Sequence, residues 1–292
     1  MHAETPSPGR ASPSKLRGVF LNRDRNLRNG WWVVAFLAVL AAMLFPAVLV
    51  SARLGHEISI WEQALLIAVA TVVLQALRRK PVREVTGPFD VRWPAQFAIG
   101  SALGFLLMIV PAAALWMAGV VEFAVVAAEP RAILSALALM AGVAVAEELL
   151  FRGFLFQRLI AGMGLWPAQI IMGGMFVLTH MGNPGMDGGI RLLAGLNIFL
   201  ASLMFGQAFV RTRSLALPIG LHFMANTTQG VLLGFGVSGA DQPSLLTPRQ
   251  LTDAEWLTGG SFGLEASLPG LLAVSVMLVL LLTGGRESSL PG

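Results

Sequence analysis

The chain has 292 residues, of which 55% are hydrophobic and only 12% are charged, and its mean hydropathy is +0.73. This composition excludes an ordinary water-soluble domain and indicates a protein that crosses a membrane several times. The chain has no cysteine and no tyrosine, so disulfides, thiolate zinc sites and a cysteine nucleophile are excluded, and any acid or base must be a carboxylate, histidine, lysine or arginine.

The formal net charge of +4 does not indicate binding to nucleic acid. The basic residues lie in the segments between apolar runs, where they are typical of contacts with lipid headgroups and of topology signals. We therefore expect membrane lipids as partners and no nucleic acid.

Residues 1–30 contain prolines and basic residues but no apolar run of the kind found in signal peptides, and they predict a basic cytoplasmic tail. A membrane-spanning helix needs about 20 largely apolar residues. The candidate spans are 31–53, 58–77, 95–119, 132–160, 167–181, 190–211, 214–236 and 268–283. The sequence thus predicts an all-α fold, a polytopic bundle of about eight transmembrane helices over residues 31–284, followed by a short tail at 285–292.

The distribution of basic residues predicts the orientation of this bundle. If the amino terminus is cytoplasmic, all but four of the 20 Lys and Arg residues fall at cytoplasmic ends and loops, the exceptions being Arg53, Arg131, Arg191 and Arg249. This asymmetry follows the positive-inside rule. We expect a multi-pass protein of the inner (plasma) membrane with both termini in the cytoplasm.

In the third predicted span, Gly100 and Gly104 are small residues one helical turn apart and predict close packing of this span against a neighbouring helix.

The loop at about 237–267 carries four acidic residues. The spacing of its residues predicts a short interfacial helix near Pro248 to Leu257.

The segment AVAEELLFRGFL, residues 144–155, places three ionisable side chains inside an apolar run. A charge in hydrocarbon is costly unless it is paired, protonated or facing a wet cavity, so Glu147, Glu148 and Arg152 are candidate functional residues. Glu148 and Arg152 are four positions apart in the favourable order and predict an ion pair. Glu147 points about 100° away around the helix. We expect it to be an unpaired carboxylate that faces a polar cavity, as a general base requires.

Three further polar residues, His180, His222 and Asn226, lie in predicted spans. Counting about 1.5 Å per residue from the hairpin turns places both Glu147 and His180 about 20 Å from the cytoplasmic surface. The same count places His222 and Asn226 at roughly 12 and 18 Å, on one face of their helix. Two hairpins that are distant in sequence therefore bring a carboxylate, two imidazoles and a carboxamide to similar depths, within a predicted catalytic core at about 132–236.

Three short motifs occur in order in this core: EELLFRG at 147–153, FVLTH at 176–180 and HFMAN at 222–226. They resemble the EExxxR, FxxxH and HxxxN motifs of the CPBP family of intramembrane proteases, also called Abi. That family includes the CAAX prenyl endopeptidases and bacteriocin self-immunity proteins. The resemblance covers about residues 140–235, roughly a third of the chain.

The resemblance implies an intramembrane CAAX-type endopeptidase that hydrolyses peptide bonds in membrane-associated or lipidated proteins or peptides. Glu147 and His180 would activate the attacking water. His222 and Asn226 would polarise the scissile carbonyl and its oxyanion, or join in metal ligation. Glu148 and Arg152 would support these groups.

Two versions of this chemistry remain open. One is a metalloprotease in which Glu147, His180 and His222 hold Zn²⁺, because histidine and carboxylate are ligands that suit zinc. The other is a metal-free, glutamate-type endopeptidase in which the same residues act directly on water and carbonyl.

Buried ionisable residues also occur in proton-coupled transporters, and the same fold can serve a non-catalytic bacteriocin-immunity or membrane scaffold protein. Inverted repeats would favour a transporter, and the sequence shows none. Cleavage that depends on Glu147 would distinguish the protease from both alternatives.

Overall fold

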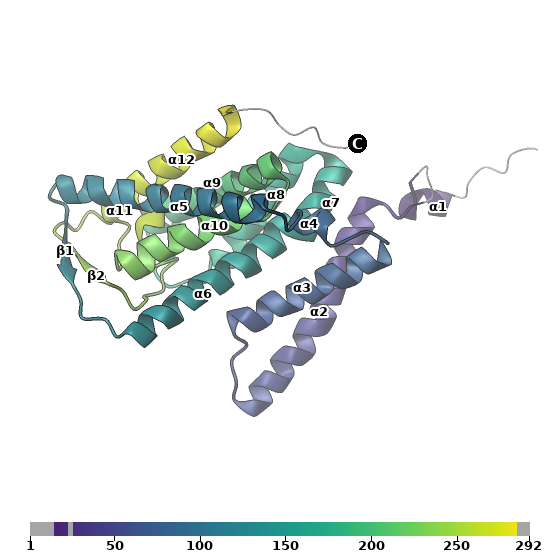
Figure 1. Cartoon of the computed structure of the whole chain (residues 1–292), viewed down its shortest axis with the longest axis horizontal. Coiled ribbons are helices and arrows are strands. Elements are labelled where there is room, and N and C mark those ends of the chain that lie inside the picture. The colour runs from purple at the N-terminus through teal and green to yellow at the C-terminus, as the bar shows by residue number, and fades with distance from the viewer. Residues whose placement is uncertain (1–14, 23–25, 285–292) are drawn as a thin grey trace, which may run out of the picture.

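A computed structural model describes residues 15–22 and 26–284 of the chain. It is 72% helical, and Figure 1 shows its elements. The α-helices are α1 (Lys15–Phe20), α2 (Asn29–Leu54), α3 (Ile60–Leu77), α4 (Arg83–Thr86), α5 (Arg92–Met117), α6 (Pro130–Glu148), α7 (Phe154–Met163), α8 (Leu165–His180), α9 (Ile190–Thr212), α10 (Ala216–Asn226), α11 (Glu255–Thr258) and α12 (Leu268–Thr283). The other elements are the π-helical turns η1 (Leu149–Gly153) and η2 (Thr227–Leu232), the 3-10 turn η3 (Leu264–Ala266) and the strands β1 (Val121–Val125) and β2 (Leu246–Gln250).

The predicted all-α fold is confirmed, and a helix occupies each of the eight predicted spans. Within the described residues, five helical segments are long and apolar enough to cross a membrane: α2, α3, α5, the continuous stretch Pro130–Met163 and α9. The remaining three, α8, α10 with η2, and α12, are shorter. Most of the predicted tails, 1–30 and 285–292, lies outside the described residues, although Lys15–Phe20 forms α1.

Local sequence signals define the first hairpin. Gly55 ends α2 because its φ of 63° lies in the left-handed region that glycine adopts without strain. Ser59 and Glu62 then form a capping box that starts α3, each side chain accepting a hydrogen bond from the other residue's backbone N–H. These two helices pack on α6 and α7 and project from one side of the main bundle (Figure 1).

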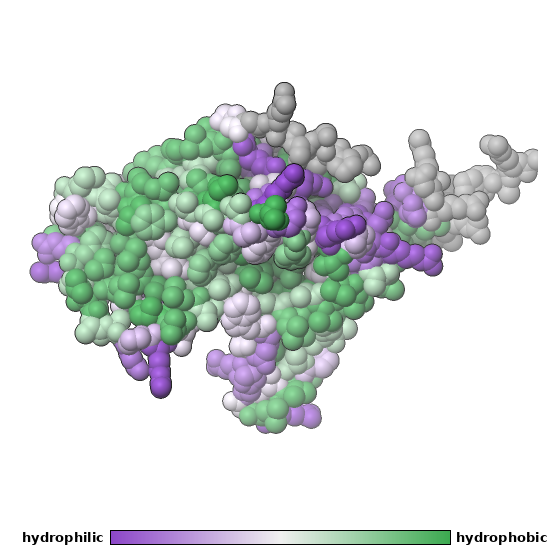
Figure 2. All heavy atoms as spheres, in the orientation of Figure 1, coloured by the Kyte–Doolittle hydropathy of each residue, from purple (hydrophilic) through white to green (hydrophobic). Residues whose placement is uncertain are grey.

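Apolar side chains cover much of the outer surface in Figure 2, as expected for helices that contact lipid. Hydrophilic side chains gather instead at the end where α1, α4 and α7 lie. In α2, Phe36 is the only buried residue, whereas α9 and α10 are buried over most of their length. The structural core therefore runs along α9 and α10.

Glycine permits the close contact between α5 and α10. A Cβ at Gly104 would overlap the Leu221 carbonyl oxygen, and one at Gly220 would overlap the Phe97 carbonyl oxygen. Gly100 meets α10 in the same way. The predicted close packing at Gly100 and Gly104 is confirmed, and it fixes the helix that carries His222 and Asn226.

The predicted interfacial helix near Pro248 to Leu257 is largely wrong. Residues 246–250 form β2, which pairs antiparallel with β1 so that Val121 lies opposite Gln250, and only Glu255–Thr258 is helical. The strand partner lies more than a hundred residues earlier in the chain, so no local spacing could reveal it.

We predict that Gly104→Leu lowers the stability of the protein by about 1–3 kcal/mol, because the new side chain must push α10 away from α5. Gly174→Leu is the matched control, since a Cβ at Gly174 on α8 meets no atom within 4 Å. Thermal unfolding in detergent, followed by tryptophan fluorescence, measures the difference. An equal loss in both variants would contradict the packing argument.

Candidate active site

The acidic motif lies where α6 changes into a wider π-helical turn. Glu147 and Glu148 are the last two residues of α6, and Arg152 lies within η1. The third motif ends in the same manner, since η2 begins directly after Asn226. Single π turns inside α-helices occur frequently at functional sites; here η1 lies within the first motif and η2 directly follows the third.

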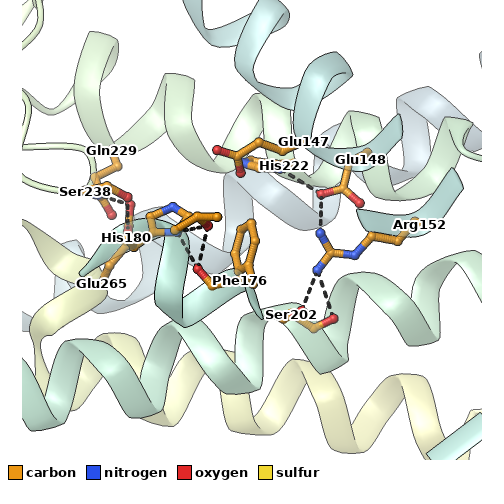
Figure 3. A network of polar contacts seen from close by, with 11 residues as sticks. Glu147, Glu148, Arg152, Phe176, His180, Ser202, His222, Gln229, Ser238 and Glu265 are labelled. Atoms are coloured by element: carbon orange, nitrogen blue, oxygen red, sulfur yellow. Dashed lines mark hydrogen bonds and ion pairs between the residues drawn. The ribbon is translucent and has the colours of Figure 1, made fainter. Parts of the chain in front are cut away.

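Glu148 and Arg152 form the ion pair that their spacing predicts. Arg152 Nη1 lies 3.2 Å from Glu148 Oε1, and the two side chains are 1% and 0% exposed. Arg152 Nη2 donates to the backbone oxygen and to the hydroxyl of Ser202 on α9, both at 3.0 Å (Figure 3). The pair therefore ties η1 to α9 in the interior of the bundle.

Glu148 has a second partner, His222. The Nδ1–H of His222 donates to Glu148 Oε1 over 2.8 Å, and the imidazole stacks on Phe205 with ring centroids 4.8 Å apart. Both contacts fix the ring orientation. Because Nδ1 is engaged, Nε2 is the nitrogen available to the cavity.

Glu147 does not stand alone, and the prediction of an unpaired carboxylate is wrong in this respect. Its Oε2 lies 3.8 Å from His222 Nε2, within reach of an ion pair when the histidine is protonated. The same oxygen accepts no hydrogen bond within the described part of the chain. Helix depth estimated from hairpin lengths could not reveal this contact, because it depends on the rotation of α10 about its axis.

His180 is the last residue of α8. Its Nδ1–H donates to the Phe176 carbonyl oxygen over 2.7 Å, and its ring lies 4.6 Å from the Phe176 ring. No hydrogen bond joins it to Glu147 among residues 15–22 and 26–284. The two predicted water-activating residues are therefore brought to one cavity but not into direct contact.

That cavity has a volume of about 300 Å³ and is lined by Glu147, His180, His222 and Asn226, among other residues. Apolar side chains from α5, α6, α8 and α9 supply much of the remaining lining, among them Met108, Met140, Phe176 and Phe205. A mostly apolar cavity with a few convergent polar groups is typical of a substrate site.

One ionisable group at the cavity was not predicted as a site residue. Glu265 of η3 lines it and is buried, accepting hydrogen bonds from Ser238 Oγ at 2.8 Å and Gln229 Nε2 at 3.0 Å. Figure 3 shows its carboxylate beside the ring of His180. Burial raises the pKa of Glu265, while the Ser238 hydrogen bond and the charge of His180 oppose this effect. In the sequence Glu265 is one of four acidic residues of the loop at about 237–267, and no motif separates it from the other three.

The described side chains do not fit the predicted zinc site. Glu147 and His222 face each other, but no group of three or more His, Cys, Asp or Glu residues in the described ranges is arranged to hold a metal ion. His180 would have to move towards the other two to complete a ligand set. The zinc version therefore stays a prediction without geometric support.

The fold and site define a helical membrane protein with an ionisable centre inside the bundle. Residues 129–228, about a third of the chain, match the sequence model of the family described as Type II CAAX prenyl endopeptidase Rce1-like. All six predicted site residues fall in this segment, so the resemblance to CAAX-type proteases is confirmed. The match supports a CAAX-type intramembrane protease at the level of the family, and the long apolar helices of the described residues indicate a multi-pass membrane protein. Comparison with curated proteins and with solved structures gave no match.

We predict that stability depends on pH through Glu265. A carboxyl whose pKa is raised by folding favours the folded state below its unfolded pKa, about 4.3, and this contribution is lost as the pH rises through the folded value. Melting temperature should therefore fall less steeply from acid to neutral pH in Glu265→Gln than in the unsubstituted protein.

Glu255→Gln is the control, because Glu255 lies in the same loop but is exposed. It should keep the pH dependence of the unsubstituted protein. An unchanged slope in Glu265→Gln would show that this carboxyl does not titrate differently in the folded state.

Proposed function

We propose that the protein is an intramembrane endopeptidase in which Glu147 is the general base. The observation that carries this proposal is the chain of contacts from Arg152 through Glu148 and His222 to Glu147, which ends at the cavity wall. Three of these residues are buried and mutually paired. Glu147, with its unbonded oxygen, is the member that can accept a proton from water.

Charge balance supports this assignment. In a medium of low dielectric constant each buried charge requires a counter-charge. Arg152 compensates Glu148, and a protonated His222 compensates an ionised Glu147. The free enzyme would then hold a basic carboxylate and an acidic Nε2–H side by side at the cavity.

The reaction follows from these two groups. Glu147 takes a proton from water as the water oxygen attacks the carbonyl carbon of the scissile peptide bond, and His222 Nε2–H donates to the developing oxyanion. The proton on Glu147 then passes to the leaving nitrogen as the carbon–nitrogen bond breaks. No covalent intermediate with the protein forms.

His180 and Asn226 contact the reacting atoms directly in this proposal. Both line the cavity, and with Nδ1 bonded to the Phe176 carbonyl oxygen, His180 has Nε2 left to accept a hydrogen bond from water. The Asn226 amide is one turn beyond His222 and suits a second donor to the oxyanion. Glu265 sets the charge beside His180.

The substrate class follows from the surroundings of the site. The catalytic groups lie inside a helical bundle with an apolar exterior, so substrates are membrane-associated peptides or proteins, including lipidated ones. Location in the plasma membrane with both termini cytoplasmic belongs to the same proposal and rests on the distribution of basic residues.

We predict that Glu147→Gln reduces peptide cleavage by at least about 10²-fold, the contribution typical of general acid–base catalysis, while the protein remains folded. Glu57→Gln, at an exposed carboxylate, should leave cleavage unchanged. Cleavage of a prenylated CAAX peptide and its unlipidated counterpart in nanodiscs provides the assay, and quantitative proteomics of membranes carrying each variant extends it to other substrates. Retained cleavage in Glu147→Gln would end the assignment of this base.

Metal dependence is tested separately. Because the three candidate ligands are not grouped, we expect purified protein to contain no stoichiometric zinc and to retain cleavage after dialysis against a chelator. Elemental analysis and activity before and after chelation measure both. Loss of cleavage that Zn²⁺ restores would instead support the metalloprotease version.

A further inference from the structure

A second pocket lies at the end of the bundle where the hydrophilic side chains gather (Figure 2). We call it the basic pocket; it has a volume of about 1160 Å³ and lies between the start of α2, the end of α3 and α7. Its basic residues are Arg28, Arg78, Arg79, Lys80 and Arg158. None of the described residues that line it is Asp or Glu. The pocket is separate from the cavity that contains Glu147.

Two of these arginines, Arg78 and Arg158, are largely buried in the wall of the pocket. The side chains of Arg78 and Arg158 are only 9% and 13% exposed, and both pair with the same oxygen, Oε1 of Glu84, at 3.1 and 3.2 Å. One carboxylate thus serves two guanidinium groups. The cluster keeps an excess of positive charge.

Among the described residues, Arg158 has an unsatisfied hydrogen-bond donor in addition to its share of the excess positive charge. Its Nη2 bonds Glu84 and its Nη1 donates to Asn29 Oδ1 at 3.4 Å, but its Nε is buried without a hydrogen-bond partner within the described part of the chain. A buried donor on a charged group is costly to leave unbonded. An anion in the pocket would supply the missing negative charge beside this guanidinium.

The remaining walls of the basic pocket are apolar. Trp31, Trp32, Leu77 and Leu159 lie beside the basic residues. Tryptophan at the end of a span is typical of the headgroup level of a bilayer. The pocket therefore pairs a cationic surface with an apolar one at that level, which suits an amphipathic anion better than a soluble one.

We propose that the basic pocket binds the phosphate headgroup of an anionic phospholipid, with the acyl chains along the apolar side of α2 and α7. Basic pockets between membrane helices bind such headgroups elsewhere. The lipid phosphate would contact Arg78 and Arg158 from the wall and Lys80 and Arg79 from the rim. This proposal does not depend on the protein being a protease.

The test uses the full-length protein in detergent with added lipid. Phosphatidylglycerol should raise the melting temperature, and native mass spectrometry should retain it on the protein, whereas phosphatidylcholine and inorganic phosphate should do neither. Replacing Arg79 and Lys80 together by glutamine should weaken phosphatidylglycerol binding by about five- to tenfold per residue. Both residues are exposed and take no part in the Glu84 cluster.

The matched control replaces two exposed basic residues outside the basic pocket, Arg53→Gln in the last turn of α2 together with Arg131→Gln in the first turn of α6. This double variant has the same net charge as the first and should bind phosphatidylglycerol normally. If both double variants bound phosphatidylglycerol equally weakly, the loss would come from the lower net charge of the protein and not from the basic pocket, and the proposal would be overturned. Equal stabilisation by inorganic phosphate would identify a soluble-anion site and would also overturn it, as would equal binding of phosphatidylcholine.

Discussion

The buried ion pair between Glu148 and Arg152 is the interaction on which the candidate site depends. Removing either partner would leave an uncompensated charge inside the bundle, a loss of about 3–5 kcal/mol in comparable cases. The guanidinium is also enclosed by aromatic rings, lying 5.0 Å from the Phe176 centroid and 5.1 Å from that of Phe205. The pair thus connects η1 with α8 and α9, and it reaches α10 through His222.

This connection gives the ion pair a chemical consequence beyond stability. Glu148 Oε1 accepts from Arg152 and from the Nδ1–H of His222, so the tautomer and orientation of the imidazole are set by a group that cannot itself reach the cavity. Nε2 is thereby presented to Glu147. Two adjacent glutamates on one helix acquire different roles because only one of them meets the arginine.

Sequence alone predicted the spans and most of the polar centre, because periodicity, apolar length and the solvation cost of charge are local properties. The pairing of Glu148 with Arg152 followed from helical spacing, whereas the contact of Glu147 with His222 required the rotation of α10, which Gly104 and Gly220 determine by letting two backbones touch. Glu265 and the strand pair β1–β2 were missed because their partners lie far away in the chain.

Strand β2 and the turn η3, which carries Glu265, both belong to the segment between η2 and α12. Strand β2 follows η2, and η3 places Glu265 beside His180 where the loop after α10 meets α8 and α9. Gln229 of η2 donates both to Glu265 and to the Gly236 carbonyl oxygen. The loop therefore supplies a hydrogen-bonded carboxylate to the cavity wall, while the ion pair of Glu148 and Arg152 orients His222 on that wall through Glu148 Oε1.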